Sequence, residues 1–219
     1  MWQVDNTLKP KHAKFGGQIQ LIIKVNTPFC IGRANIYGGP CNVYKKSFFR
    51  DKVVALGEIG LDYSDNNHVE PSIQKRVFSA QVILAISLNL PICLHVRQAD
   101  EDGLKILDEA KLPKNYRIHL HCFNSHWQNC KMWMEKYPNL KVGFTPMITY
   151  EKNRHLHEVV REIPLERVLL ETDSPYFLPR QEPNSQSGIS HPGYVIHTAA
   201  QIALLKNVPI EGKIMFFVR

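Results

Sequence analysis

Four side chains of this sequence are of the types that bind metal ions and move protons. Two are carboxylates and two are imidazoles, and each follows a short apolar run: Glu58, His95, His121 and Asp173. Mixed oxygen and nitrogen ligands suit Mg²⁺, Mn²⁺ or Zn²⁺ and do not choose between these ions. A carboxylate can also span two cations, and such a pair stabilises both the attacking and the leaving oxygen of an in-line displacement. The residue types therefore predict a divalent metal site with hydrolytic chemistry.

The apolar runs are typical of strands in a parallel sheet. We expect strands at residues 53–58, 91–95, 116–121, 140–145 and 168–172. We expect helices between them at residues 71–88, 101–110, 127–137 and 155–163. Strands that are apolar throughout and alternate with helices indicate a parallel sheet with helical crossovers. A lone histidine or glutamate at a strand end is more often structural. Four at the carboxyl ends of four strands predict one shared site, because parallel barrels build their active sites there.

Composition narrows the class of protein. With 219 residues, 44% hydrophobic and 21% charged, one soluble globular domain is expected. No apolar run approaches the roughly 20 residues of a membrane span, and the N-terminus lacks the order of a signal peptide. The five cysteines form no CxxC pair. Reduced thiols in the nucleus or cytoplasm are therefore expected.

The positive net charge is concentrated at the front of the chain. Residues 1–57 hold nine Lys or Arg and two acids, for +7, whereas residues 58–219 hold 18 of each sign, for zero. A basic face binds phosphates by releasing counterions, but a scattered basic excess is usually a solvated surface. The charge alone leaves nucleic-acid binding open.

Four motifs follow one another along the chain. They are Gly57-Glu58-Ile59-Gly60-Leu61-Asp62-Tyr63, Leu94-His95-Val96-Arg97, His121-Cys122-Phe123 and Glu171-Thr172-Asp173-Ser174-Pro175-Tyr176. In order and spacing they resemble the signature motifs of the TatD family of DNases, over about Val53 to Leu205. Residues 176–181 and 191–193 most resemble the animal paralogues in which a TatD domain ends a longer polypeptide. The resemblance implies an α/β, TIM-barrel-like (β/α)₈ fold of the metallo-dependent hydrolase type. It also implies metal-dependent phosphodiester hydrolysis of DNA, possibly extending to RNA.

The same resemblance implies a role for each of the four side chains. Glu58 matches the carboxylate that ligates and often bridges the metals, and His95 and His121 match single imidazole ligands. Asp173 matches the aspartate that ligates metal and can accept a proton from the attacking water. Glu58 and Asp173 are thus the expected catalytic residues. A divalent ion, Mg²⁺ ahead of Mn²⁺ or Zn²⁺, is the expected cofactor, and nucleic acid is the expected partner.

Two more motif residues are candidates for contacts with substrate. Arg97 could meet a phosphate oxygen, which its planar fork suits. It could equally form a salt bridge with Glu101 or Asp102. Asp62 could position substrate, although capping of the turn after Gly60 is the preferred interpretation.

Residues around His121 have a mixture of expected roles. Phe123 is a third candidate for substrate contact, although its turn, Phe123-Asn124-Ser125, departs from the family's small or Gly-containing loop. His119 shares a strand face with His121 one layer deeper, and we favour a buried, hydrogen-bonded histidine over a ligand. Cys122 is expected to pack. Glu171 could neutralise a buried neighbour such as Arg97. Four further histidines of the C-terminal half are assigned to the surface or to helices: His126, His155, His157 and His197.

Both ends of the chain depart from the family pattern. The family opens with His-x-His on its first strand, whereas His12 is the only histidine before Glu58. The Gly-x-His-Pro of the third strand is also absent. We expect residues 1–52 to be a divergent basic segment with one barrel strand at Gln18–Val25. Residues 53–209 are then a TatD-like barrel lacking the first strand, and residues 210–219 a divergent tail.

The missing His-x-His leaves three functional interpretations. We expect a TatD-like nuclease with impaired activity. The first alternative is an inactive remnant that binds metal or nucleic acid. The second is a related amidohydrolase, which is disfavoured because such enzymes also need the opening His-x-His.

Overall fold

The sheet of the protein consists of parallel strands that follow one another in chain order. The computed structural model describes residues 21–24, 53–182 and 188–210, the first of these as backbone only. Its strands are β1 (Leu21–Lys24), β2 (Val53–Asp62), β3 (Ile92–Arg97), β4 (Ile118–His121), β5 (Lys141–Phe144) and β6 (Val168–Leu170). They lie in the order β1-β2-β3-β4-β5-β6, and every neighbouring pair is parallel. Each crossover thus adds the next strand to the same growing edge, as in a (β/α) barrel. The predicted parallel α/β architecture is confirmed.

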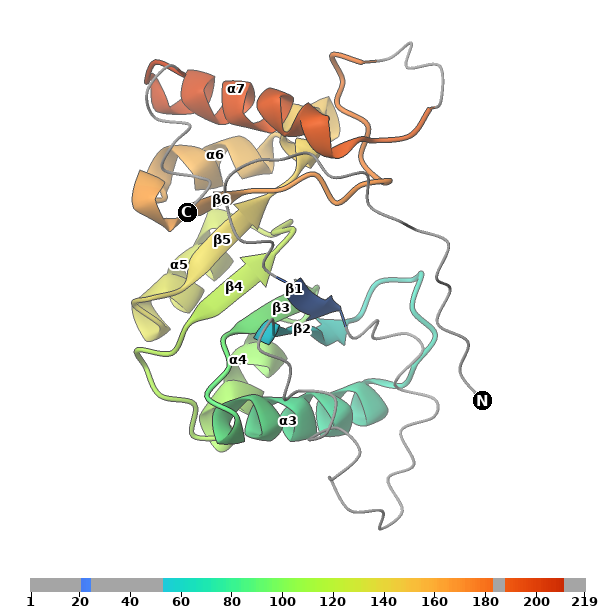
Figure 1. Ribbon diagram of the computed structural model, residues 1–219, viewed down its shortest axis with the longest axis vertical. Helices are drawn as coiled ribbons and strands as arrows, with labels where there is room; N and C mark the ends of the chain where they lie inside the picture. Colours follow the sequence, from blue (N-terminus) through green and yellow to red (C-terminus); the bar gives the residue numbers. More distant parts are fainter. Residues whose placement is uncertain (1–20, 25–52, 183–187, 211–219) are drawn as a thin grey trace.

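The helices form an arc around the outside of this sheet (Figure 1). They are α3 (Pro71–Ser87), α4 (Asp100–Glu109), α5 (Trp127–Lys136), α6 (His155–Glu162) and α7 (Val195–Lys206). Short 3₁₀ turns lie at η1 (Pro146–Thr149), η2 (Glu151–Asn153), η3 (Leu165–Arg167) and η4 (Pro192–Tyr194). Pro71 occupies the first turn of α3, where its missing N–H costs no helical hydrogen bond. All the helices of the described segments lie on this side, and the polar residues described next lie at the carboxyl ends of the strands.

The predicted strands and four predicted helices agree closely with the structure, whereas α7 was not predicted. Of the strand predicted at Gln18–Val25 the structure describes β1, which pairs with β2. The strand predicted to end at Glu58 runs on to Asp62. The rest of the predicted basic segment, including His12, lies outside the described residues. The three segment boundaries stay predictions.

The hydrophobic core lies between the sheet and the arc of helices. Leu56, Ile59 and Leu61 of β2 are at most 1% exposed, and Trp133 of α5 is fully buried. Each such side chain contributes about 1.5–3 kcal/mol when it is fully buried. The core therefore fixes the strands whose carboxyl ends carry the polar residues described next.

In the described part of the chain, no helix is long and apolar enough to cross a membrane. Cys93, Cys122 and Cys130 are free thiols.

Candidate metal centre

An irregularity in β2 turns Glu58 away from the hydrophobic core. Strict alternation would place Glu58 on the same face as Leu56, which is buried in the core. However, Gly57 pairs with Cys93 and the next pair is Ile59 with Leu94, so Glu58 is an extra residue. Such a bulge switches the face of the strand. Ile59 therefore returns to the core while Glu58 faces the opposite side of the sheet.

A glycine allows β2 and β3 to approach each other beyond this bulge. Gly60 has a φ of +150°, and a Cβ atom there would overlap the carbonyl oxygen of His95. Any other residue would be strained in this conformation and would push the strands apart. Gly60 of this motif is therefore needed for structure, because it allows the backbone of His95 to lie next to β2.

His121 is the centre around which the predicted ligands gather. Its Nδ1 lies 3.1 Å from Oε1 of Glu171. Its Nε2 lies 3.8 Å from Oε2 of Glu58 and 3.7 Å from Oδ1 of Asp173. The rings of His95 and His121 are 6.5 Å apart between centroids. The structure thus brings the four predicted ligands to one place, because the carboxyl ends of their strands meet there.

Glu171 immediately follows β6 and holds the other side of the His121 ring. Its side chain is 10% exposed, and its Oε2 accepts a hydrogen bond of 2.8 Å from the backbone N–H of Cys122. A Cβ atom on Gly143 would overlap this carboxylate, so the glycine of β5 provides its space. Glu171 does neutralise partly buried neighbours, but these are His119 and His121, so Arg97 was the wrong example. The carboxylate also accepts the backbone N–H in the turn after β4.

Below this layer lies a second histidine that also contacts Glu171. Nε2 of His119 forms an ion pair with Glu171 Oε1, and its Nδ1 lies 3.5 Å from Sγ of Cys93. This half-buried, partnered histidine matches the preferred interpretation of His119. Cys93, His119 and His121 also offer ligand atoms within 4.8 Å of one another. The geometry therefore leaves a deeper cation site open as an alternative.

The electrostatics of the cluster favour positive charge at its centre. Burial lowers the pKa of His121, but the carboxylates of Asp173, Glu171 and Glu58 outweigh burial and raise that pKa to about 10. Burial raises the pKa of Glu171, but its two histidine partners hold it well below its usual range. Three carboxylates around one imidazole create a potential that stabilises a cation. A divalent ion among them would meet the same field.

His95 meets a further carboxylate on the neighbouring strand. Its Nε2 lies 3.4 Å from Oδ2 of Asp62, whose Oδ1 accepts a 2.8 Å hydrogen bond from the N–H of Ser64. Burial raises the pKa of Asp62, but these contacts outweigh it and lower the pKa to about 2. Asp62 thus caps the turn, as preferred, and also orients His95. Asp62 contacts Nε2 of His95, so Nδ1 is the ring nitrogen of His95 that could bind a metal ion.

The ligand atoms fit a small divalent cation. Nε2 of His121 lies too far from both carboxylates for a direct hydrogen bond. Two atoms that are each about 2 Å from a common ion lie roughly 3–4 Å from one another, and both separations fall in this range. Glu171 fixes the ring from its other nitrogen, an arrangement common for histidine ligands of metals. His121 Nε2 could therefore share a cation with a carboxylate oxygen of Glu58 or of Asp173, with His95 nearby. His121, Cys122 and Asp173 also lie within 4.8 Å of one another.

Of the residues predicted to contact substrate, Phe123 is buried in the core and Arg97 lines a pocket. Phe123 is 4% exposed and packs edge to face on Phe144, with centroids 6.5 Å apart. The prediction that Phe123 contacts substrate is not retained, because its side chain belongs to the core. Arg97 lines the pocket described below. Among the described residues no carboxylate forms an ion pair with Arg97, since Asp102 is bound by Lys75 and by the Tyr63 hydroxyl instead.

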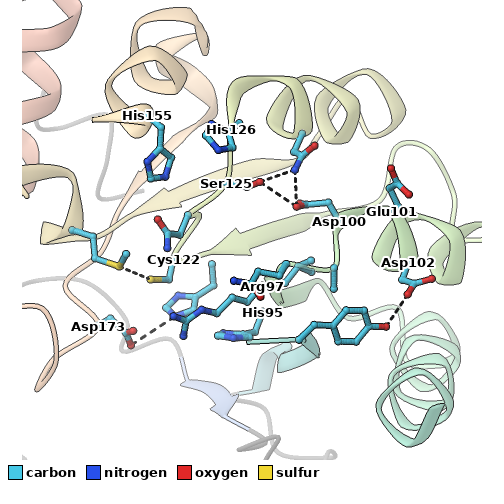
Figure 2. Close-up of a pocket in the computed structure, with 18 of the residues that line it drawn as sticks. His95, Arg97, Asp100, Glu101, Asp102, Cys122, Ser125, His126, His155 and Asp173 are labelled. Carbon is cyan, nitrogen blue, oxygen red and sulfur yellow. Dashed lines mark hydrogen bonds and ion pairs between the residues drawn. The ribbon is translucent and has the colours of Figure 1, made fainter. Parts of the chain in front are cut away.

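A pocket of about 720 Å³ opens beside this cluster (Figure 2). At one end it is lined by His95, His121 and Asp173, and at the other by His126 and His155. The last two had been assigned to the surface or to helices. Their position could have been found from the sequence, because they follow the strands predicted at residues 116–121 and 140–145, at the same carboxyl ends as the ligands.

A sheet of (β/α)-barrel order with carboxylates and imidazoles gathered at its carboxyl ends is the arrangement of metal-dependent hydrolases. The chain belongs to the family of TatD related DNases, whose pattern its residues 42–214 match. The resemblance seen in the four motifs is thereby confirmed.

Curated relatives and a solved structure agree with this assignment. The chain is 44% identical to the human 3'-5' RNA nuclease TATDN2 over 160 residues, which are 73% of this chain and 21% of that protein. It is 37% identical to the 3'-5' ssDNA/RNA exonuclease TatD of Erwinia amylovora, over 73% of this chain and 61% of that protein. The crystal structure of the TatD homologue YJJV from Escherichia coli superposes with a TM-score of 0.66 at 27% identity. It covers 77% of this chain and 62% of that one, and confirms the TIM-barrel-like fold class.

Proposed function

We propose that this chain is a metal-dependent nuclease that hydrolyses phosphodiester bonds of DNA or RNA at the cluster around His121. The chain spans about three-fifths of the bacterial relative and about a fifth of the human one. Nuclease activity of this chain is therefore part of the proposal. The observation that carries the proposal is the position of His121 Nε2 between the carboxylates of Glu58 and Asp173. The names of both relatives as nucleases support it.

The proposed roles divide between binding the ion and handling the proton. Glu58, His121 and Asp173 would hold a divalent ion, with His95 as the fourth ligand. When bound, the ion would polarise the phosphoryl group and make water a better nucleophile at neutral pH. Asp173 would accept the proton of the attacking water through its carboxylate. Glu171 would keep Nε2 of His121 directed at the site, and Asp62 would orient His95.

Arg97 is proposed to bind a phosphate oxygen of the substrate. It lines the pocket, and no carboxylate among the described residues engages its guanidinium. A planar guanidinium can donate two parallel hydrogen bonds to one phosphate. This would hold the substrate beside the ion without taking part in bond breaking.

Mg²⁺ is the proposed ion. Two carboxylates and imidazole nitrogens are a harder ligand set than thiolates and accept Mg²⁺ or Mn²⁺. Burial and nearby carboxylates raise the pKa of the Cys122 thiol far above its usual range, so it is a poor ligand at neutral pH.

The proposal is tested by removing and restoring the ion. The chain is dialysed against EDTA and then assayed on end-labelled single-stranded DNA and RNA with added Mg²⁺, Mn²⁺ or Zn²⁺. We expect hydrolysis to stop in EDTA and to return with Mg²⁺ or Mn²⁺. Hydrolysis that persists in EDTA, or that returns with none of the three ions, contradicts the proposal. The lower activity expected from the absent His-x-His stays a prediction.

A further inference from the structure

The pocket extends well beyond the candidate metal centre. Its volume of about 720 Å³ lies in the upper part of the range of about 300–1,000 Å³ for ligand pockets. A single phosphodiester group beside an ion fills only part of such a space. Figure 2 shows His126 and His155 together on the side of the pocket away from His95 and Asp173. The far end of the pocket therefore has its own wall of polar side chains.

Two imidazole rings from different crossovers meet at this far end. His126 precedes α5 directly, and His155 is the first residue of α6. Their ring centroids are 5.0 Å apart, with an angle of 47° between the planes. The ring of His126 is exposed and that of His155 is half-buried. The two rings are thus presented jointly to the pocket rather than sealed in the core.

Most other polar side chains of this wall are already engaged. Asp100 accepts hydrogen bonds from Trp133 Nε1 at 2.8 Å, Asn129 Nδ2 at 3.0 Å and Ser125 Oγ at 3.2 Å. This network ties the turn before α5 to α4 and so fixes the position of His126. Within the described residues, no side-chain hydrogen bond engages the His126 ring. Its ring nitrogens are therefore available to a ligand.

The chemistry of the pair points to an anion. Burial lowers the pKa of His155, and repulsion from His126 and His157 lowers it further, although a hydrogen bond to the backbone of Asn124 opposes this. An anion between the rings would offset this repulsion, since a negative charge attracts the positive edges of both imidazoles. Figure 2 shows Glu101, which would repel an anion, on the opposite side of the pocket from His155.

We propose that His126 and His155 form a second phosphate subsite, which binds the backbone of a nucleic-acid strand at a phosphate other than the one being cleaved. This inference rests on the proposed function, because it assumes that the metal end of the same pocket receives the scissile phosphate. The subsite would increase the affinity for a polymeric substrate, whereas a small phosphodiester is too short to reach it.

The test measures binding without chemistry. The full chain is titrated in EDTA against a fluorescein-labelled single-stranded oligonucleotide, and the dissociation constant is read from anisotropy at several salt concentrations. For His126→Asn combined with His155→Asn we expect the dissociation constant to rise about tenfold. We also expect the slope of log Kd against log salt to fall by about one, as for the loss of one phosphate contact. His126→Asn alone, at an exposed position, should show part of both effects.

Matched variants separate the subsite from general damage. His68→Asn removes an exposed histidine outside the pocket and should bind as the unchanged chain does. His126→Lys places a cation at the site and should retain affinity. With the ion restored, the double variant should raise KM for the oligonucleotide and leave hydrolysis of bis(p-nitrophenyl) phosphate unchanged.

Three outcomes would overturn the subsite. The first is an unchanged dissociation constant in the double variant. The second is weaker binding with an unchanged salt slope, which would indicate stacking on a base instead of a phosphate contact. The third is an equal loss on the small phosphodiester. Because binding is measured in EDTA, failure of the metal-dependent reaction leaves this test valid, and the two proposals can fail separately.

Discussion

Replacing Asp173 by Asn is expected to lower kcat on single-stranded DNA by at least a hundredfold. Asparagine has the shape of aspartate but cannot accept the proton of the attacking water, and proton transfer by a positioned group contributes about 10²–10⁴-fold in rate. The substitution also removes a negative charge from the cation site, because Oδ1 of Asp173 lies 3.7 Å from His121 Nε2. Asp173 has a φ of +49°, a conformation that Asn adopts readily, so the backbone should not change. The measurement is kcat and KM with saturating Mg²⁺ or Mn²⁺.

The matched control is Asp65→Asn, at an exposed position in the loop before α3. It should keep full activity, and both variants should have the circular dichroism spectrum of the unchanged chain. An Asp173→Asn variant that is folded and as active as the control would remove Asp173 from the mechanism.

Glu171→Gln is expected to weaken both the fold and the hold on the ion. Glutamine keeps the size of the side chain but loses the charge that faces His119 and His121. Breaking a buried ion pair by removing one partner costs about 3–5 kcal/mol. Loss of the group that orients a histidine ligand typically costs 10–100-fold in metal affinity. We expect a lower free energy of unfolding in urea and a Mn²⁺ dissociation constant raised at least tenfold.

The pH dependence of this stabilisation follows from the direction in which the pKa of Glu171 is shifted. The pKa of Glu171 is lowered in the folded chain, so its contribution is present above its unfolded pKa and is lost as pH falls through the folded one. The loss of stability in Glu171→Gln should therefore be clear at neutral pH and shrink in acid. The control is Glu166→Gln, an exposed glutamate at η3. Equal stability and affinity in both variants would show that Glu171 does not position His121.

The order of strands and helices could be predicted because each rests on local patterns. Apolar runs of strand length and helical spacing after Pro71 are visible within a few residues. Because parallel strands align their carboxyl ends, placing His95 and His121 side by side also followed from the sequence alone. The register pairs these two residues directly.

Other features depend on pairings that local patterns do not encode. The face of Glu58 is set by a bulge that exists only when β2 pairs with β3. Phe123 was expected in the pocket, but Cys122 has a φ of +46°, and in the turn that follows β4 the ring of Phe123 lies in the core. His126 and His155 are brought together by the packing of two helices. Glu171 was assigned the wrong partner, because the space for its carboxylate comes from Gly143 on another strand.

The most direct test of the account is to locate the ion itself. Crystals of the chain grown with Mn²⁺ would be measured with X-rays tuned to its anomalous scattering. The account predicts a peak about 2 Å from His121 Nε2 and from carboxylate oxygens of Glu58 and Asp173. A peak only at the deeper group formed by Cys93 and His119, or no peak near His121, would contradict it.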